Sequence, residues 1–525
     1  FNTSEFKIFD HYIYALVGEG CLMEGVSNEA SSFAGNNKLN NLIVFYDKNQ
    51  ITIDGNISIT FTDDIKKRYE SYHWNVIETT MYDFAKIEQA VSSAKLQDKP
   101  TLIILDSVIG KGAPTVEGTS KAHGAPLGVE GAAKAKTALG LDPEKFFAVD
   151  EKAYEYFKKR QSDFSKAEED WKKLFDNYAK KQPEKYGELI SYFDEAAVAK
   201  KISSVEFPVY AEGDSISTRV ASGKALNAVA KKFAALVGGS ADLEGSNCTK
   251  LENEAYFSPT DYSGRSIHFG IREFAMAAIC NGIALHKPLH PFCATFLIFS
   301  DYLKPALRLS ALMKLPVIYV LTHDSIYVGE DGPTHQPIET IAMLRSVPNC
   351  YVLRPCDAEE TNEAWKFAMQ SKTTPVCLIL SRQNLPVVKK HDTHWKENFS
   401  KGAYTVHKPD GKIDITILAT GSEVSLALNA LKLSKNKNVQ IISVTCKELL
   451  EQMKQGELET LFDGKLESRK VITCEAGIRQ GWEHWCKDKH NCFSLECFGL
   501  SGKGSEVASR LSFTAQDLAC LIDKI

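Results

Sequence analysis

Short runs of β-branched and other apolar residues alternate with helical patterns along most of this chain. In its first third, apolar runs at residues 12–17, 41–46 and 100–106 predict strands, and residues 83–96 have the spacing of a helix. Apolar runs of this length, separated by helices, are typical of strands in a parallel sheet that is buried on both faces. The pattern therefore predicts a parallel α/β layer near the start of the chain.

Two further blocks repeat this pattern. Strands of the second block are expected at residues 235–238, 316–322, 350–354 and 375–381, and the third block opens with an apolar run at 414–420. Between the first two blocks, lysine, glutamate, aspartate and aromatic residues dominate without strand patterns, which predicts a solvated helical connector. We therefore expect three consecutive α/β domains with mainly parallel sheets. Their predicted bounds are 1–142, 211–390 and 401–525, with the connector at 143–210.

A glycine-containing turn follows the first predicted strand. The sequence Gly18-Glu19-Gly20 comes directly after it, and Asn49 and Ile51 follow the second strand. A strand that breaks at glycines into a helix presents backbone N–H groups to an anionic phosphate. A carboxylate and an amide after two strands can also share a hard cation such as Mg²⁺, which prefers oxygen ligands. The turn is therefore a candidate phosphate and metal site.

The second block contains a carboxylate in apolar surroundings. Glu273 begins an apolar stretch that predicts a buried helix, where a lone charge is unfavourable unless it has a dedicated partner. A helix-capping role or a pair with Arg272 would also explain it. Further on, Phe296, Phe299 and Tyr302 have the spacing of one helical face, which is typical of core packing and also fits a cofactor pocket.

The segment 323–339 places two histidines and several carboxylates around a Gly-Pro turn, just beyond a predicted strand. Ligands of open α/β sheets bind at the carboxyl ends of the strands. Salt-bridged loop packing is the alternative for this segment. Arg382 also follows a strand, and it is either an anion ligand or a routine surface charge.

Composition narrows the class of protein. The 525 residues are 44% apolar and 25% charged, with a formal charge of −5, which fits a soluble globular protein and argues against nucleic acid as the main partner. No apolar run is long enough to cross a bilayer, so no membrane partner is expected. The 13 cysteines lack the spacing of a zinc site or a redox pair, which suits a reducing cytoplasm.

Together these residues resemble the transketolases, thiamine-diphosphate enzymes of the pentose phosphate pathway. The matching motifs, which run nearly the whole length of the chain, lie at 18–25, 51–55, 121–127, 238–247, 270–282, 323–339 and 381–386. The resemblance implies a thiamine-diphosphate-binding fold that occurs twice, followed by a transketolase C-terminal domain. The first block would be the diphosphate-binding domain and the second the pyrimidine-binding domain.

The resemblance also implies a cofactor site. In that family Glu19, Asn49 and the carbonyl of Ile51 would hold Mg²⁺, with Ca²⁺ or Mn²⁺ as substitutes. Glu273 would be catalytic, through a hydrogen bond to the aminopyrimidine of thiamine diphosphate. Because the family's cofactor lies between two chains, a homodimer is implied. The residues implied to contact the cofactor are Gly18, Gly20, Glu24, Asn49, Asp242, Phe296, Phe299 and Tyr302.

The implied reaction transfers a two-carbon ketol unit from a ketose phosphate to an aldose phosphate through the ylid of thiamine diphosphate. The sugar phosphate would be bound by Arg219, Ser246, His323 and Arg382. Asp331 would contact a hydroxyl of the donor sugar. His335 would act at the ketose carbonyl oxygen, and His123 would face both cofactor and substrate.

Two departures from the family leave alternatives open. Position 19 carries Glu where the family has Asp, and a long segment precedes the equivalent of Phe1 in family members, so the diphosphate-binding domain is expected to be incomplete here. Either the sequence belongs to a working transketolase and omits this segment, or it is a transketolase-like protein with impaired or no catalysis. Dihydroxyacetone synthase is a further alternative. The segment 323–339 disfavours 1-deoxyxylulose-5-phosphate synthase, and the phosphate-binding set disfavours a 2-oxo acid dehydrogenase component.

Overall fold

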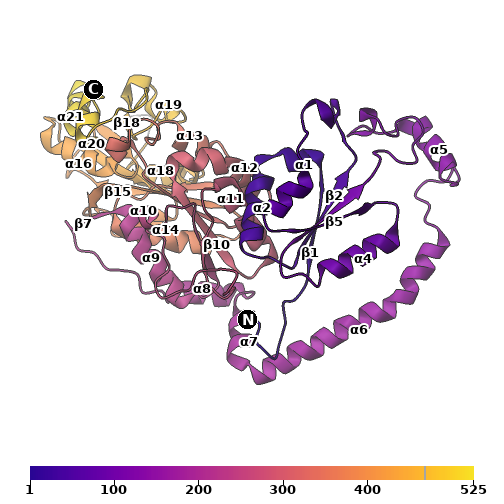
Figure 1. Cartoon of the computed structure of the whole chain (residues 1–525). Helices are drawn as coiled ribbons and strands as arrows, with labels where there is room; N and C mark the ends of the chain where they lie inside the picture. The colour runs from indigo at the N-terminus through magenta and orange to yellow at the C-terminus, as the bar shows by residue number, and fades with distance from the viewer. Residues whose placement is uncertain (466–468) are drawn as a thin grey trace. The chain divides into compact units, whose positions relative to one another are not determined.

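A computed structural model describes residues 1–465 and 469–525. The chain divides into two compact units, Phe1–Ser191 and Tyr192–Ile525. The first unit contains a parallel sheet with the strand order β1-β2-β6-β5 (Figure 1). Its strands are β1 (Ile13–Gly18), β2 (Leu42–Lys48), β5 (Asn75–Thr80) and β6 (Thr101–Asp106). The sequence pattern predicts three of them and misses β5, which contains the exposed Glu78 and three other polar residues that are half-buried.

Helices cover both faces of this sheet. Val44 of β2 packs in one core cluster with residues of α2 (Gly25–Asn36) and α3 (Ile65–Ser71). Its neighbour Ile43 packs in another cluster with residues of α4 (Phe84–Ala94). Adjacent residues of a strand point to opposite faces, so a continuous apolar run is what such a strand requires. At the edge of the sheet, β1 leaves Leu16 82% exposed.

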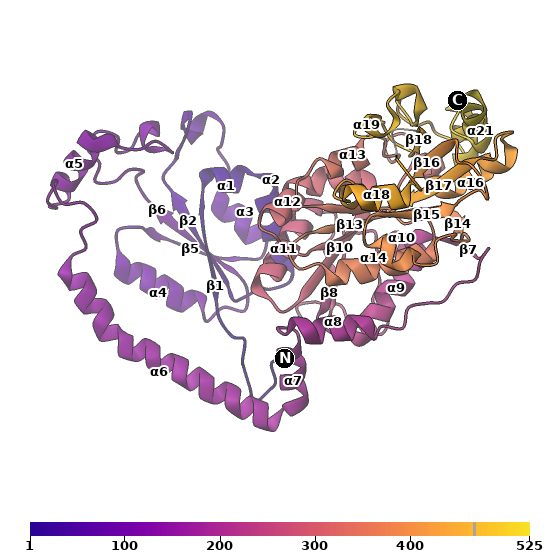
Figure 2. The ribbon, with the colours of Figure 1, turned by 180° about the vertical axis from the view of Figure 1, so that it is seen from behind.

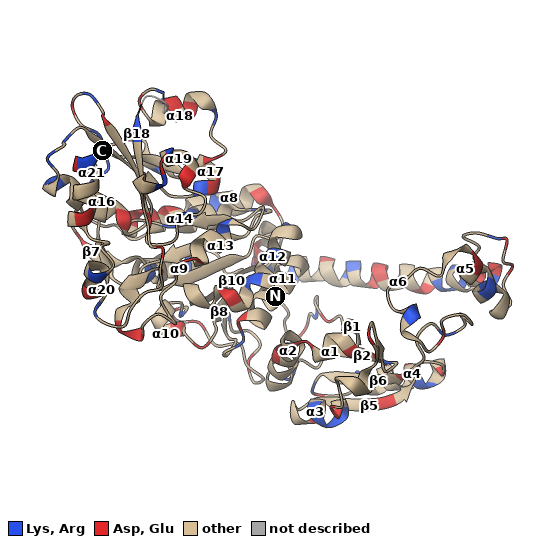
Figure 3. Ribbon diagram, turned by 90° about the horizontal axis from the view of Figure 1, so that it is seen from above, with Lys and Arg blue, Asp and Glu red and all other residues tan. Residues whose placement is uncertain are grey.

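The predicted connector is helical. It contains α6 (Glu151–Lys181), α7 (Pro183–Ser191) and α8 (Glu195–Ser203), preceded by α5 (Gly128–Ala138). Acidic and basic residues interleave along α6, as Figure 3 shows, and Tyr178 is its buried residue. The N-terminal segment packs against that point, because Phe6 and Ile8 share a buried cluster with Tyr178. In the structure, residues 151–203 of this segment are mainly helical and mostly exposed.

The second unit contains two larger sheets. The first has the order β12-β13-β11-β10-β8-β9, and all of its strands are parallel. Their bounds are β8 (Leu236–Ser240), β9 (Ser266–His268), β10 (His290–Phe296), β11 (Ile318–Thr322), β12 (Tyr351–Leu353) and β13 (Val376–Leu380). Among the helices around it, α9 (Thr218–Lys232) packs on α14 (Ala358–Gln370), and α11 (Glu273–His286) packs on α12 (Ser300–Leu312) (Figure 2).

One local prediction is wrong in this sheet. Phe296 is the last residue of β10, Phe299 ends a 3₁₀ turn, η3 (Leu297–Phe299), and Tyr302 lies in α12. The three aromatic residues therefore do not form one helical face. The apolar run continues from the strand through the turn at 297–299 before the polar Ser300 and Asp301 begin the helix, so the spacing of the aromatics resembled helical periodicity by coincidence.

The remaining sheet has the order β15-β17-β16-β18-β19, in which β15 is antiparallel and the other pairings are parallel. Its strands are β15 (Ala403–His407), β16 (Ile415–Ala419), β17 (Val439–Val444), β18 (Lys470–Cys474) and β19 (Cys492–Phe493). Ile417 packs in one core cluster and Leu418 in another, so β16 is also covered on both faces. The expectation of mainly parallel α/β layers is confirmed.

Two general findings complete the fold. Within residues 1–465 and 469–525, no helix combines the length and the apolarity needed to cross a membrane. All 13 cysteines are free thiols, and eight of them are buried.

Candidate functional site

The glycine turn of the first unit lies where β1 ends. Gly18 is the N-cap of α1 (Glu19–Met23), and the parallel pairing of β1 with β2 places it opposite Asp47. Glu19 is only 2% exposed, and its Oε1 accepts a hydrogen bond of 2.5 Å from the backbone N–H of Gln50. An added Cβ at Gly18 or Gly20 would meet no atom within 4 Å, so the backbone there is open to a ligand.

Asn49 and Ile51 lie at the same place. Asn49 Oδ1 accepts a hydrogen bond of 3.0 Å from the N–H of Ile51, which begins the short hairpin of β3 (Ile51–Thr52) and β4 (Gly55–Asn56). Burial raises the pKa of Glu19, although hydrogen bonds from neighbouring backbone N–H groups lower it. A bound cation would favour the ionised carboxylate. Carboxylate, amide and carbonyl oxygens are the ligands that Mg²⁺ prefers, so these residues fit such an ion.

The other predicted residues of this unit are more open. Glu24 is the N-cap of α2 and is exposed, and His123 is an exposed residue that follows the 3₁₀ turn η2 (Ser120–Ala122). No hydrogen bond or ion pair in the described part of the chain joins either of them to Glu19.

In the second unit, four neighbouring strands carry predicted residues to one edge of the sheet. Phe296 ends β10, His323 directly follows β11, and Arg382 lies two residues beyond β13. Ser246 lies on α10 (Glu244–Asn247), which follows β8. Because β8, β10, β11 and β13 are adjacent and parallel, their carboxyl ends share one edge. The ligand position expected for an open α/β sheet is therefore present.

His323 lies at the centre of this cluster. It is 4% exposed, has a left-handed backbone (φ +62°), and stacks on Phe296 with the ring centroids 3.8 Å apart. His335 approaches from the next segment, 5.5 Å from the ring of Phe299. Burial, and then the charges of Arg219, Arg382 and His335, lower the pKa of His323 to about 3. The ring is therefore neutral at physiological pH.

Two arginines face this neutral ring. Arg219 is the second residue of α9, and its Nη1 donates a hydrogen bond of 2.7 Å to the carbonyl of Ser246. Its buried Nε has no hydrogen-bond partner among the residues that the structure describes. Arg382 is exposed, and within residues 1–465 and 469–525 neither arginine makes an ion pair. Guanidinium groups with unused donors beside a neutral imidazole suit an anionic ligand such as a phosphate.

The structure places four other predicted residues around this edge. Glu273 is the first residue of α11 and is 9% exposed. Tyr302 is 63% exposed, with its ring 6.2 Å from that of Phe299. Asp331 ends the 3₁₀ segment η4 (Ile326–Asp331), and Asp242 follows β8 with a left-handed φ of +59°. In the described residues, no hydrogen bond or ion pair links Asp242 or Asp331 to His323.

The sequence reasoning missed the polar residues beneath His323. Thr322, Asn247 and Ser240 are buried and hydrogen-bonded in series below its ring. It also missed Arg354, which binds the carboxylates of Asp324 and Glu423 in the interior. Ser240 and Asn247 lie within the motif at 238–247, and Thr322 directly precedes the motif at 323–339. Nothing in the sequence marks these three residues as hydrogen-bond partners.

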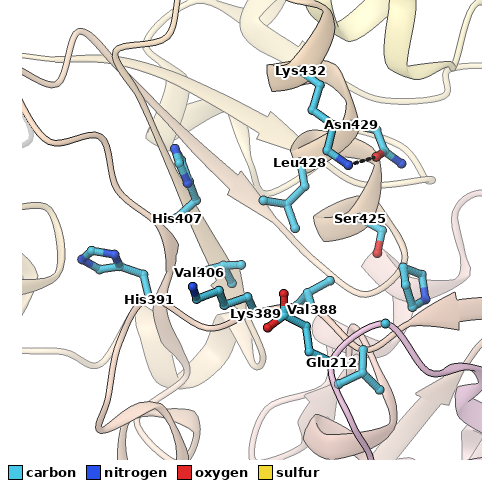
Figure 4. A pocket seen from close by; sticks show the side chains of 13 residues that line it. Glu212, Val388, Lys389, His391, Val406, His407, Ser425, Leu428, Asn429 and Lys432 are labelled. Carbon is cyan, nitrogen blue, oxygen red and sulfur yellow. Dashed lines mark hydrogen bonds between the residues drawn. The ribbon is translucent and has the colours of Figure 1, made fainter.

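A cavity of about 450 Å³ lies elsewhere in the second unit (Figure 4). Its walls come from β14 (Asn384–Pro386) and the residues after it, from β15, and from α16 (Glu423–Leu433). Lys389, His391, His407, Ser425 and Asn429 are among its lining residues. No residue predicted for the cofactor or substrate lines it.

Comparisons with known proteins agree with this geometry. Residues 1–196 match the family model of the transketolase thiamine diphosphate binding domain. Residues 214–388 match the transketolase pyrimidine binding domain, and residues 402–514 match the transketolase-like C-terminal domain.

Individual relatives extend over nearly the whole chain. It is 49% identical to the transketolase of Treponema pallidum, over 99% of this chain and 78% of that protein. Transketolase of Halalkalibacterium halodurans is 41% identical over 98% of this chain and 77% of its own length. The solved transketolase of Leishmania mexicana has a TM-score of 0.93 and 36% identity, covering 99% of this chain and 76% of that one.

Transketolase of Pichia stipitis in complex with sedoheptulose 7-phosphate has a TM-score of 0.93 and 39% identity, covering 100% of this chain and 77% of that one. With three domain models matched in order and relatives of this identity, the chain belongs to the transketolase family.

Proposed function

We propose that this chain, an enzyme of the transketolase family, transfers a two-carbon ketol unit from a ketose phosphate to an aldose phosphate, as a step of the pentose phosphate pathway. The observation that carries the proposal is the cluster at the carboxyl edge of the six-stranded sheet. There two arginines, which have no carboxylate partner among the described residues, and a neutral histidine lie beside the stacked rings of Phe296 and Phe299. Similar transketolases have been solved with xylulose 5-phosphate and with sedoheptulose 7-phosphate.

The substrate phosphate would be bound by Arg219 and Arg382. Arg219 keeps a buried Nε–H without a partner, and Arg382 is exposed after β13, so both can donate to phosphate oxygens. Ser246 lies beside Arg219, held by the bond from its guanidinium to the Ser246 carbonyl. Asp331 would contact the substrate hydroxyl nearest the reacting bond. His335, whose ring lies 5.5 Å from that of Phe299, would contact the carbonyl oxygen of the ketose.

Thiamine diphosphate would supply the carbon nucleophile for the cleavage and formation of the C–C bond. Glu19, Asn49 and the carbonyl of Ile51 would hold the Mg²⁺ that accompanies its diphosphate, with the Gly18–Gly20 turn, Glu24 and His123 nearby. Glu273 would hold or move a proton at the pyrimidine ring, since a buried carboxyl is suited to proton exchange. Asp242, Phe296, Phe299 and Tyr302 would pack around that ring.

A homodimer is part of the proposal. On α12 and at its C-cap, the apolar side chains Tyr302, Leu309, Leu312 and Met313 are 43–67% exposed. Burying such a face against a second copy would remove it from water. Sedimentation of the wild-type protein and of Leu312→Asp tests this, with dissociation of the variant as the expected result and a monomeric wild type as the result against it.

A cytoplasmic location is also proposed, since a reducing compartment suits 13 free thiols.

The activity test uses the purified protein with thiamine diphosphate, Mg²⁺, a ketose 5-phosphate and an aldose phosphate. We expect a ketose phosphate two carbons longer than the acceptor, detected by mass spectrometry, only when the cofactor is present. Calorimetry with thiamine diphosphate on the same sample shows whether the cofactor binds. Cofactor binding without any ketol transfer would overturn the proposed function. Preferred use of formaldehyde as the acceptor would replace it by dihydroxyacetone synthase activity.

A further inference from the structure

A series of buried hydrogen bonds leads from His323 into the protein interior. His323 Nδ1 lies 2.8 Å from Thr322 Oγ1, which lies 2.7 Å from Asn247 Oδ1. Asn247 Nδ2 lies 2.7 Å from Ser240 Oγ, which lies 3.1 Å from the carbonyl oxygen of Ala294. His323, Thr322, Asn247 and Ser240 are all 4% exposed or less, so water does not compete for these bonds.

The protons of this series can be ordered by counting donors. The Ala294 carbonyl only accepts, so Ser240 gives it its single hydroxyl hydrogen and must itself accept from the Asn247 amide. Asn247 Oδ1 then points to Thr322 and accepts the hydroxyl hydrogen of Thr322. Because that hydrogen is used, Thr322 Oγ1 accepts a hydrogen bond from Nδ1–H of His323. Turning the Asn247 amide around would make only three of the four contacts hydrogen bonds. The arrangement that satisfies all four contacts protonates His323 at Nδ1.

The opposite nitrogen of the ring is then an acceptor. Nε2 carries a lone pair and lies on the side of the ring away from Thr322, while the ring itself is held by stacking on Phe296. The charged or titratable groups that act on the ring are Arg219 from α9, Arg382 from the segment after β13, and His335 from the segment after η4. Arg219 and Arg382 can only donate hydrogen bonds, so Nε2 of His323 is the group beside these two arginines that can accept one.

We propose that Thr322, Asn247 and Ser240 are positioning residues that fix the Nδ1–H tautomer of His323, so that its Nε2 accepts a hydrogen bond from the phosphate end of the substrate. This inference rests on the proposed function. A phosphate monoester that carries one proton satisfies the whole group, because its bare oxygens accept from the arginines and its P–OH donates to Nε2. A sulfate ester has no such proton and would lose that bond.

Three variants separate positioning from packing. Thr322→Val removes the hydroxyl that orders the ring, and Thr322→Ser keeps it. Thr295→Val is the matched control, because Thr295 is a fully buried threonine whose Oγ1 has no hydrogen-bond partner in the described part of the chain. If Thr322→Val does not fold, Ser240→Ala replaces it, because it frees the Asn247 amide to turn and so mixes the two tautomers.

The first measurement is long-range ¹H–¹⁵N NMR on histidine-labelled protein, with the His323 signal assigned by its absence from His323→Asn. We expect the Nδ1–H tautomer in the wild type, in Thr322→Ser and in Thr295→Val, and its loss in Thr322→Val. An Nε2–H tautomer in the wild type would overturn the inference. This result does not depend on activity, so it stands apart from any failure of the proposed function.

The second measurement is steady-state kinetics with a ketose 5-phosphate and with the same sugar lacking its phosphate. For Thr322→Val we expect KM for the phosphorylated sugar to rise about tenfold, the effect of about one hydrogen bond to a charged group, with kcat nearly unchanged. The unphosphorylated sugar and Thr295→Val should show no change, and Thr322→Ser should restore KM. An equal change for both sugars, or a change in kcat alone, would contradict the positioning role.

An independent observation concerns two cysteines near the C-terminus. Cys486 ends α19 (Glu483–Cys486), Cys492 begins β19, and their Sγ atoms lie 3.5 Å apart. Cys486 is 4% exposed and also contacts Thr473 Oγ1 at 3.3 Å, whereas Cys492 is partly exposed. The hydrogen bond between the two sulfurs lowers the pKa of Cys492 to about 7, so thiolate is present at neutral pH.

We infer that Cys492 and Cys486 form a reversible disulfide when the protein meets a hydroperoxide. The Cys492 thiolate attacks the terminal peroxide oxygen, the O–O bond breaks, and a sulfenic acid forms while the leaving oxygen takes a proton. The Cys486 thiol then attacks that sulfur, which forms the S–S bond and releases water. The thiol pair is oxidised by two electrons, and the peroxide is reduced to an alcohol or to water.

Hydrogen peroxide followed by peptide mapping under non-reducing conditions tests this site. We expect a Cys486–Cys492 cross-link that dithiothreitol reverses, and a dimedone-trapped sulfenic acid at Cys492 in Cys486→Ser. The matched control is the pair Cys350 and Cys377, whose sulfurs lie 3.8 Å apart but which are 2% and 0% exposed and should remain reduced. Oxidation of the exposed Cys520 without any Cys486–Cys492 cross-link would overturn the inference.

Discussion

His323 and Asp324, which directly follow β11, lie beside arginines in two different environments. Asp324 binds Arg354 through Nη2 at 2.8 Å and through Nε at 3.1 Å, and Arg354 is also paired with Glu423 in the same buried network. His323, one residue earlier, faces Arg219 and Arg382, for which the described residues provide no carboxylate.

The two environments differ in how the charge of the guanidinium is compensated. A buried guanidinium is stable only when carboxylates and hydrogen bonds compensate its lost hydration, as around Arg354, which also donates to Thr420. Arg219 and Arg382 keep donors free at the edge of the sheet, where a ligand can take them up. The proposed anion site therefore rests on arginines that lack a carboxylate partner among the described residues and lie beside a neutral histidine.

The largest expected effect concerns the structural arginine. Arg354→Met leaves the buried carboxylates of Asp324 and Glu423 without their partner, and we expect the free energy of unfolding to fall by about 3–5 kcal/mol. Urea denaturation followed by circular dichroism measures it. Arg382→Met, at an exposed position, is the control and should change stability by less than about 0.5 kcal/mol. Equal stability of the two variants would break the comparison.

Two buried glutamates extend the comparison, since Glu273 begins α11 and Glu423 begins α16. We expect Glu273→Ala to lower turnover at least about a hundredfold, the effect of losing the proposed proton-transfer group, without changing how the protein sediments. Glu423→Ala should instead lose stability, because Arg354 is left with less compensation. Turnover of Glu273→Ala above about five per cent would contradict its proton role.

A smaller effect is expected at Arg382, the proposed phosphate ligand. Arg382→Ala should raise KM for phosphorylated sugars about 10- to 100-fold and change kcat less than about threefold, because a remote phosphate is held alike in the ground and transition states. Initial rates with and without the sugar phosphate group measure this. Arg510→Ala, at an exposed position on α20 (Gly504–Arg510), is the matched control. A loss confined to kcat would count against phosphate binding.

The smallest effect concerns acid stability. Burial alone would raise the pKa of Glu475, but Arg345, at 2.7 Å, together with Arg354 and Trp482, lowers it to about 2 from 4.5. Because the folded pKa lies below the unfolded one, this stabilisation is complete above pH 4.5 and is lost as the pH falls toward 2.

Glu475→Gln should therefore show a shallower fall of the urea midpoint between pH 4.5 and pH 3 than the wild type. Glu397→Gln, which changes an exposed glutamate, is the control and should follow the wild type. Parallel curves for Glu475→Gln and the wild type would show that this ion pair does not set the acid limit.

Much of the fold and part of the site could be predicted from the sequence. Continuous apolar runs such as 100–106 identify strands covered on both faces, and β6 is buried from Thr101 to Leu105. The start of α11 at Glu273 and the positions of His323 and Arg382 after strands could be read in the same way. β5 was missed because its polar residues hide the alternation of apolar and polar positions that marks a strand. β10 was missed because its apolar run continues into the next turn, so the end of the strand is not marked.

The sequence by itself determined the α/β class, the order of its layers and the residues at the strand ends, because these depend on local periodicity and on motifs within a few residues. Only the tertiary structure decided which arginine meets a carboxylate and which has none among the described residues. Thr322 and Asn247 are separated by 75 positions, yet their bond sets the proton of His323. Parallel strands bring distant residues to one edge, and the protonation of a buried group depends on those distant neighbours.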